Sequence, residues 1–237
     1  MSTNLFSKSL VAGAAFAALV VMGVAIAPPS VRAKNDNNGA QDDKEMIRIG
    51  LAVAPVPLNM AGKDQDLVGL GSYIVNITGD CNGCHSHGPA TEYVLPNGNP
   101  YLRQPPFDGT IRVNPSTYLG GGRDFGTFPP VPGAELHIIS RNLTPDKSGL
   151  PEGGRTLSEF IQIMRTGVDL DHAHPNCPGN TPGPDCMLAP FDGDKLQIMR
   201  WPSFQNMTDR QLTAIYTYLS TVPCVEGGPG EPSPRCQ

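Results

Sequence analysis

The chain has 237 residues, of which 17 are Lys or Arg and 22 are Asp or Glu, so it is acidic. This balance argues against nucleic acid as a partner, because the phosphate backbone attracts positively charged surfaces. The 27 glycines and 25 prolines make up more than a fifth of the chain, which predicts much irregular backbone.

Residues 1–33 have the pattern of a secretory signal peptide. Lys8 supplies a short basic region, an apolar Ala/Val-rich run follows at 10–27, and V-R-A at 31–33 is a small-residue cleavage site. The alternative is an uncleaved anchor, for which an apolar run of 18 residues is at the lower limit of length. Without residues 1–33, 15 Lys and Arg remain against 22 Asp and Glu, a net charge of −7. We therefore expect a periplasmic protein that contacts a membrane only if this segment is retained.

Residues 34–62 are expected to form a disordered leader and an extended arm. Residues 34–45 (KNDNNGAQDDKE) are polar, which predicts disorder. Residues 46–62 are apolar but are interrupted by Pro55 and Pro57, so we interpret them as an extended arm that lies on the domain. The domain is then expected to span residues 63–224, with a loose Gly/Pro-rich tail at 225–237.

A first helix is predicted at residues 67–78. Its apolar stripe follows the 3.6-residue period and consists of Leu67, Leu70, Ile74 and Ile77. Gly69 and Gly71 lower the helix propensity, which is understandable if another helix crosses closely at these positions. The helix leads directly into the most informative motif of the chain.

The motif is C-N-G-C-H at residues 81–85, the attachment signature of a c-type haem. The thiols of Cys81 and Cys84 are expected to bond the two vinyl groups of the porphyrin, and His85 to be the proximal iron ligand. A thioredoxin-like redox pair would need a βαβ setting, and a zinc site would need a second Cys/His pair at regular spacing. The sequence predicts neither, and it contains one such motif, so we expect one covalently bound haem c.

Residues 89–137 are rich in Pro, Gly and aromatic side chains and show no lasting periodicity. We interpret them as a long insertion loop with turns at 96–98 and 120–122. A loop of this length is usually functional or packed against another part of the protein.

Two further helices each begin with a capping box. Thr156 and Glu159 start a helix that runs to about residue 166, where Gly167 is placed to end it. Thr208 and Gln211 start the last helix, which ends near residue 223. Their apolar faces consist of Leu157, Phe160, Ile161 and Met164, and of Leu212, Ile215, Tyr216 and Leu219.

This order of helices, with the C-x-x-C-H motif after the first, resembles a class I cytochrome c domain. Further blocks look like those of bacterial cytochrome c domains related to the subunits of periplasmic alcohol and aldehyde dehydrogenases. These blocks are G-S-Y at 71–73, G-G-R-D-F at 121–125, N-L-T-P-D at 142–146, R-T-G-V-D at 165–169 and M-R-W-P-S-F at 199–204. The resemblance covers roughly residues 67–223. It implies a mainly α, cytochrome c-like helical domain around one haem, with long Pro/Gly-rich loops.

A low-spin electron-transfer haem needs a second axial ligand, and a thioether raises its potential relative to a second imidazole. The methionines that follow the motif are Met164, Met187, Met199 and Met207. The resemblance places the ligand at Met199, in a loop just before Trp201, although Arg200 stands where the family usually has Pro. We interpret Met164 and Met207 as core and capping residues of their helices.

Other side chains are also candidate metal ligands. His172 and His174 compete with Met199 because imidazole also binds iron, although loop histidines of this kind are usually surface residues. Four carboxylates suggest calcium but do not have the spacing of an EF-hand, so we interpret them as turn and capping groups. They are Asp169, Asp171, Asp192 and Asp194.

Four cysteines remain beside the haem motif and suggest two disulfides in an exported protein. They are Cys177, Cys186, Cys224 and Cys236. The local pairing is Cys177–Cys186 with Cys224–Cys236, and the alternative joins Cys177 or Cys186 to Cys224. The spacing leaves both open, because a disulfide depends on the Cα separation.

These features together predict an exported single-haem c-type cytochrome that carries one electron between redox protein partners. The donor would be a dehydrogenase and the acceptor an oxidase or another cytochrome, and no catalytic residues are expected. One alternative is the electron-accepting subunit of a periplasmic dehydrogenase, with residues 89–137 as its interface. Another is a haem enzyme or sensor with an open iron site. The family's subunits often carry three haem domains, so the single motif favours a free-standing carrier.

Overall fold

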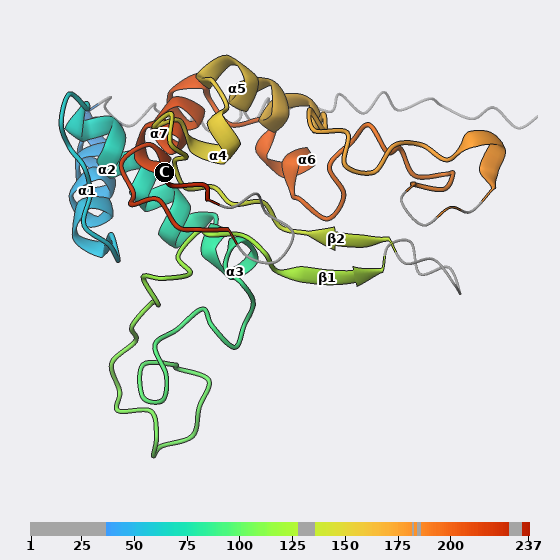
Figure 1. Cartoon of the computed structure of the whole chain (residues 1–237). Coiled ribbons are helices and arrows are strands. Elements are labelled where there is room, and N and C mark those ends of the chain that lie inside the picture. The colour runs from blue at the N-terminus through green and yellow to red at the C-terminus, as the bar shows by residue number, and fades with distance from the viewer. Residues whose placement is uncertain (1–36, 128–135, 182, 184–185, 228–233) are drawn as a thin grey trace, which may run out of the picture. The chain divides into compact units, whose positions relative to one another are not determined.

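The computed structural model describes residues 37–127, 136–181, 183, 186–227 and 234–237 (Figure 1). The signal peptide expected at 1–33 lies outside these residues. The helices are α1 Asn37–Val53, α2 Gln65–Tyr73 with the π-helical turn η1 Ile74–Thr78, α3 Cys81–His85, α4 Pro151–Gly154, α5 Leu157–Thr166, the 3₁₀ turn η2 Pro178–Asn180, α6 Trp201–Phe204 and α7 Asp209–Leu219. Among the described residues, no helix has the length and apolar character needed to cross a membrane.

Helix α1 shows that the expectation of a disordered leader and an extended arm at 34–62 was wrong. The helix ends before Pro55, and of the described residues 37–62 only those after Val53 lack helix. Its inner side chains pack against the core, among them Met46, Ile47 and Leu51. Gly50 lets the backbones of α1 and α2 approach, since a Cβ at this position would overlap Gly69, and Ser72 Oγ donates a hydrogen bond to Gly50 O at 2.6 Å. Helix α1 is therefore ordered by its packing on α2, although the polar residues at its start predicted disorder.

The first helix was predicted correctly, and the last helix crosses it. Asp64 caps α2, accepting from the backbone of Asp66 and Leu67 at 2.9 and 3.0 Å, so the helix starts two residues earlier than expected. At Gly71 a Cβ would overlap the backbone of Ala214 in α7. The absence of a side chain at residue 71 therefore brings α2 and α7 together.

Gly69 makes room for a different helix from the one that Gly71 admits. A Cβ at this position would lie 2.7 Å from Ile47 Cγ2 of α1, not against α7. The two glycines of α2 thus make room for two different helices.

Both capping boxes form as predicted. Thr156 accepts from Glu159 N while Glu159 accepts from Thr156 N, and the same exchange joins Thr208 and Gln211. Gly167 ends α5 in the left-handed conformation, with φ of 67°. The ring centroids of Phe160 and Tyr216 lie 5.7 Å apart and connect α5 to α7.

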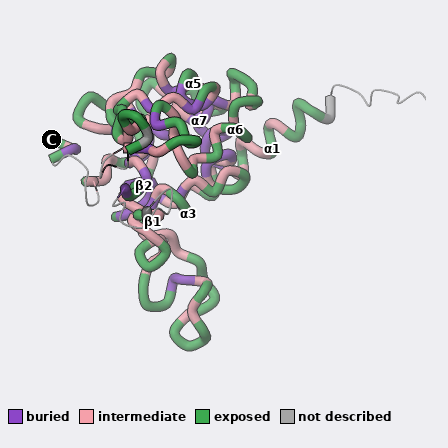
Figure 2. Tube along the Cα trace, turned by 90° about the vertical axis from the view of Figure 1, so that its right-hand side faces the viewer, coloured by how far each residue is buried: buried purple, intermediate pink, exposed green. Residues whose placement is uncertain are grey.

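Residues 89–137 are only partly an insertion. Residues 92–114 form a projecting lobe whose base is closed by a bridge between Tyr93 and Val113, and most of the lobe is exposed or half-buried (Figures 1 and 2). The part that follows the lobe reaches the core, because Tyr118 and Leu119 are fully buried. Strand β1, Asp124–Thr127, then pairs antiparallel with β2, His137–Ile139, with an irregular register.

Both local disulfides form, Cys177–Cys186 and Cys224–Cys236, with Cα separations of 4.9 and 5.7 Å. The second disulfide holds the end of a tail that was expected to be loose. Arg235 is buried and donates to the carbonyl oxygen of Thr144 at 2.9 Å. Residues 36–237 cluster as one unit, so α1 and the described end of the tail belong to the same body as the predicted domain.

Candidate functional site

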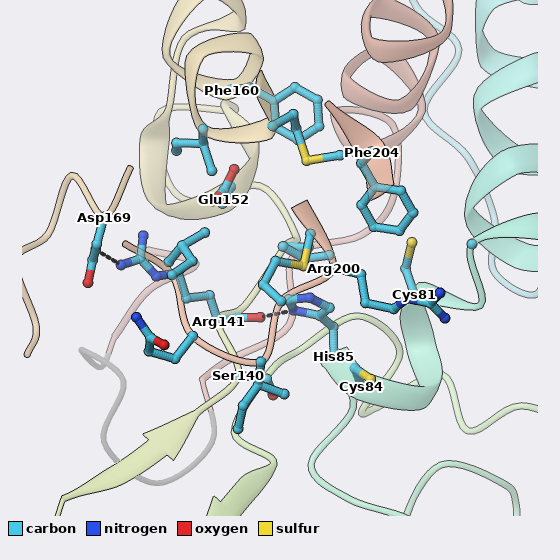
Figure 3. Close-up of a pocket in the computed structure, with 18 of the residues that line it drawn as sticks. Cys81, Cys84, His85, Ser140, Arg141, Glu152, Phe160, Asp169, Arg200 and Phe204 are labelled. Atoms are coloured by element: carbon cyan, nitrogen blue, oxygen red, sulfur yellow. Dashed lines mark hydrogen bonds and ion pairs between the residues drawn. The ribbon is translucent and has the colours of Figure 1, made fainter. Parts of the chain in front are cut away.

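One cavity joins the C-x-x-C-H motif to the segments that follow it in the chain (Figure 3). Its empty volume is about 1410 Å³, a figure that includes open solvent at its mouth. Most of its wall is apolar, including Ile74, Val75, Leu143, Phe160, Ile163, Phe204, Ile215 and Leu219. A large, flat and mainly apolar group would be shielded from water here.

The two motif cysteines line this cavity, and neither takes part in a disulfide. Burial, followed by the nearby Asp80 and Cys84, raises the pKa of Cys81 to about 12, so its thiol is protonated at neutral pH. Helix α3 is tied to a buried part of the long segment that follows it, because Asn82 Oδ1 accepts from Leu119 N at 2.9 Å. Both thiols are therefore available at one edge of the cavity.

His85 is held in one orientation by Arg141. Its Nδ1 lies 2.8 Å from the carbonyl oxygen of Arg141 (Figure 3). Because a carbonyl only accepts, Nδ1 carries the proton and Nε2 is left with a free lone pair, as in most metal-binding histidines. Burial lowers the pKa of His85, which keeps the imidazole neutral and able to bind a metal ion.

Three of the four candidate methionines line the cavity, namely Met164, Met199 and Met207. Met187 does not, because it is buried in a separate cluster with Leu136 and Ile138. Met164 projects from α5 and is 5% exposed, as expected for a core residue. The structure thus places Cys81, Cys84, His85 and Met199 around one cavity, and Met199 remains a prediction as the distal ligand.

The loop that carries Met199 is anchored at both ends. Trp201 Nε1 donates to Leu196 O at 3.1 Å, and Leu196 N donates to Gly167 O at 2.7 Å. The Trp201 ring packs against Gly167 so closely that a Cβ there would overlap it. Ile198 has φ of 66°, a strained value for a β-branched residue, directly before Met199. The fold thus imposes a fixed shape on the segment next to the predicted ligand.

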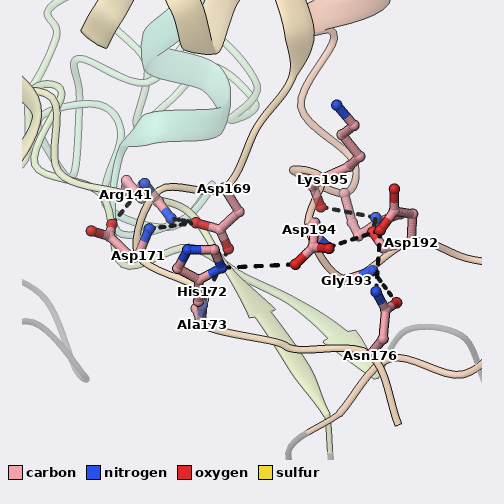
Figure 4. Close-up of polar contacts among 11 residues, drawn as sticks. Arg141, Asp169, Asp171, His172, Ala173, Asn176, Asp192, Gly193, Asp194 and Lys195 are labelled. Carbon is pink, nitrogen blue, oxygen red and sulfur yellow. Dashed lines mark hydrogen bonds and ion pairs between the residues drawn. The ribbon is translucent and has the colours of Figure 1, made fainter.

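The two competing histidines lie in different places. His174 lines the cavity, and its Nε2 lies 3.1 Å from the carbonyl oxygen of His137. The side chain of His172 is 65% exposed and lies 3.8 Å from a carboxylate oxygen of Asp194 (Figure 4). Of the two histidines, only His174 therefore lies where it could replace Met199 as the second iron ligand.

Two of the four predicted turn carboxylates, Asp169 and Asp171, pair with arginines. Asp169 pairs with Arg141, and Asp171 lies 2.7 Å from the same guanidinium (Figure 4). Asp171 also pairs with Arg155. Across the part of the chain that the structure describes, no three His, Cys, Asp or Glu side chains are grouped to hold a metal ion. Sequence reasoning missed Arg141 because its importance depends on a backbone carbonyl that meets His85 from 56 residues away.

The donor set and the wall chemistry fit a covalently bound haem. Two free thiols and a neutral imidazole come from one short helix, and the remaining wall is largely apolar. Arg141, Lys195 and Arg200 also line the cavity and are suited to the two carboxylate groups of a haem. No protein-family model, curated protein or solved structure matches this chain.

Proposed function

We propose that the chain is an exported, single-haem c-type cytochrome that carries one electron between redox protein partners. The observation that carries this proposal is the cavity lined by Cys81, Cys84 and His85, with the His85 imidazole oriented by the carbonyl oxygen of Arg141. The haem iron supplies the one-electron couple when it is bound. No substrate chemistry by protein side chains is part of this proposal.

The residues have separate roles in this proposal. Cys81 and Cys84 would attach the porphyrin, and His85 would bind the iron through Nε2. Met199 would supply a thioether ligand, from a loop shaped by Trp201. The apolar wall excludes water from the site, and the exposed Cys84 lies where the cavity edge reaches the surface.

We also assign the fold to the mainly α, cytochrome c-like class. In support, α2 leads into the motif helix α3, and α7 crosses α2 at Gly71. Two disulfides and the secretory pattern at 1–33 support export to the periplasm. The net charge of −7 without that segment suits a basic face on a redox partner.

A second candidate is the electron-accepting subunit of a periplasmic dehydrogenase. The projecting lobe at 92–114 favours it, because Leu95, Tyr101 and Ile111 are 55%, 82% and 61% exposed. Exposed apolar and aromatic side chains of this kind are common in protein interfaces. Co-purification of the full chain with a larger flavin or quinone protein would support this candidate, and loss of the complex on deletion of the lobe would locate the interface.

The test is to produce the full chain in cells that perform c-type haem attachment. The intact mass should increase by one haem, and the haem should resist extraction with acidified acetone. The reduced protein should keep its visible spectrum under carbon monoxide, since a Met-ligated iron has no open position. Extractable haem would contradict the proposal, and a carbon monoxide complex would favour the enzyme or sensor alternative.

A further inference from the structure

Glu152 places a buried carboxyl group in the wall of the proposed haem cavity. The residue is 8% exposed, and within the described residues its Oε2 atom has no hydrogen-bond partner. Figure 3 shows it on the far side of the cavity from Cys81. A buried carboxyl with an unsatisfied oxygen is costly, so its presence calls for a physical explanation.

The backbone at Glu152 is also strained. Its φ of 50° and ψ of 51° are in the left-handed region, which non-glycine residues rarely adopt. The following Gly153 and Gly154 continue at positive φ, where glycine is the residue that fits. The chain thus turns sharply at the one position of this turn that carries a carboxyl group. Strain of this kind persists where the surrounding structure imposes it, often at functional sites.

The charges around Glu152 come from three segments. Arg141 and Arg155 favour the carboxylate, while Asp171 and Asp169 oppose it. Both arginines are themselves paired with these aspartates, which weakens their attraction for Glu152. Burial has the largest effect and raises the pKa of Glu152 to about 7. The other titratable or charged groups of the cavity wall are Asp80, Cys81, Cys84, His85, His174, Lys195 and Arg200.

We propose that Glu152 takes up one proton when the site gains one electron and releases that proton when the electron leaves. This inference rests on the proposed function. The electron comes from a one-electron donor protein, the proton comes from water, and the Glu152 carboxylate becomes a carboxylic acid. The charge of the cavity is then the same before and after the step. An added negative charge in a water-poor site disfavours a neighbouring carboxylate, which is the physical cause of the coupling.

The test measures the midpoint potential of the haem-loaded chain from pH 5 to pH 9 by spectroelectrochemistry. The wild-type potential should fall as the pH rises above about 7, toward a limit of about 59 mV for each tenfold change in proton concentration. Glu152→Gln should make the potential nearly independent of pH in this range. The matched control is Glu45→Gln, an exposed carboxyl on α1 that pairs with Arg48, and it should keep the wild-type profile.

A second measurement keeps the test valid if Glu152→Gln does not fold. In the reduced-minus-oxidised infrared spectrum of the wild type, the carbonyl band of a protonated carboxylic acid should increase on reduction. A flat wild-type potential profile, an unchanged slope in Glu152→Gln, or no carboxylic acid band would overturn the inference while covalent haem is retained. Loss of covalent haem from the wild type would instead contradict the proposed function, so the two failures are distinguishable.

Discussion

Gly71 of α2 lies directly against the carbonyl of Ala214 in α7, with no space for a side chain between the two backbones. A Cβ at residue 71 would also come within 2.7 Å of Tyr218 Cβ. Tyr218 of α7 also joins a buried hydrogen bond with Tyr118, a residue outside both helices, and the two hydroxyls lie 2.7 Å apart. Since α2 leads into the motif helix, this crossing determines where the cysteines lie relative to α7.

Gly71→Ala is expected to destabilise the protein by about 1–3 kcal/mol, because backbone atoms would have to move apart to admit the methyl group. The matched control is Gly39→Ala in α1, where a Cβ meets nothing within 4 Å. That variant should be neutral or stabilised by up to about 1 kcal/mol through helix propensity. The measurement is chemical unfolding of the haem-loaded variants. Equal stability of the two variants would show that the crossing is looser than described.

Covalent attachment is expected to need both motif thiols. Cys81→Ala and Cys84→Ala should each lose one thioether bond, and the double variant should contain no covalent haem. Intact mass and haem staining after denaturing electrophoresis measure the outcome. The control pair Cys177→Ser with Cys186→Ser removes a disulfide remote from the motif and should keep the haem. Covalent haem in the double motif variant would show that another residue attaches it.

Met199→Ala is expected to abolish the weak near-infrared band from sulfur to ferric iron, because Met199 is predicted to be the distal ligand. Met207→Ala and Met164→Ala remove other cavity sulfurs and should keep the band. His174→Ala tests the remaining competitor at the cavity wall. Loss of the wild-type spectrum in His174→Ala, with Met199→Ala unchanged, would mean that the assignment to Met199 is wrong.

Thr208→Ala is expected to cost about 1 kcal/mol of stability, because the side chain accepts from Gln211 N and caps α7. Thr208→Ser keeps the hydroxyl and should lie close to the wild type. The reduction potential should be unaffected in both, since Thr208 does not line the cavity that holds the motif cysteines. Thermal unfolding and the reduction potential should both be measured for the wild type and the two variants. A large change of potential in Thr208→Ala would show that the cap acts on the site.

The stability of the oxidised, haem-loaded protein is expected to decrease as the pH rises from about 4.5 to about 7. Burial raises the pKa of Glu152 from its ordinary 4.5 to about 7, so the folded state binds the proton more tightly than the unfolded state. The contribution is complete below about 4.5 and is lost above about 7, and amounts to roughly 3 kcal/mol at most. Glu152→Gln should remove this decrease in urea unfolding at pH 5 and pH 8. A decrease of the same size in Glu152→Gln would assign it to other groups.

Local sequence patterns were sufficient to predict where the helices around the site begin and end. The capping boxes at Thr156 and Thr208 predicted two helix starts correctly, because a cap uses groups within three residues of one another. Gly167 predicted the end of α5 for the same local reason. The motif at 81–85 was sufficient to predict the candidate haem-binding residues, since covalent attachment depends on side chains that are close together in the sequence.

The features that the sequence did not predict depend on contacts between residues far apart in the chain. Helix α1 was missed because its order depends on packing against α2 at Gly50, which its own polar start does not reveal. The spacing of the cysteines left two disulfide pairings open until the Cα separations were known. The partner of His85 is the backbone carbonyl of Arg141, and a carbonyl is present at every residue, so no sequence pattern marks it. Glu152 likewise became notable only when the fold buried it in the cavity wall, because burial is a property of the surrounding chain and not of the residue.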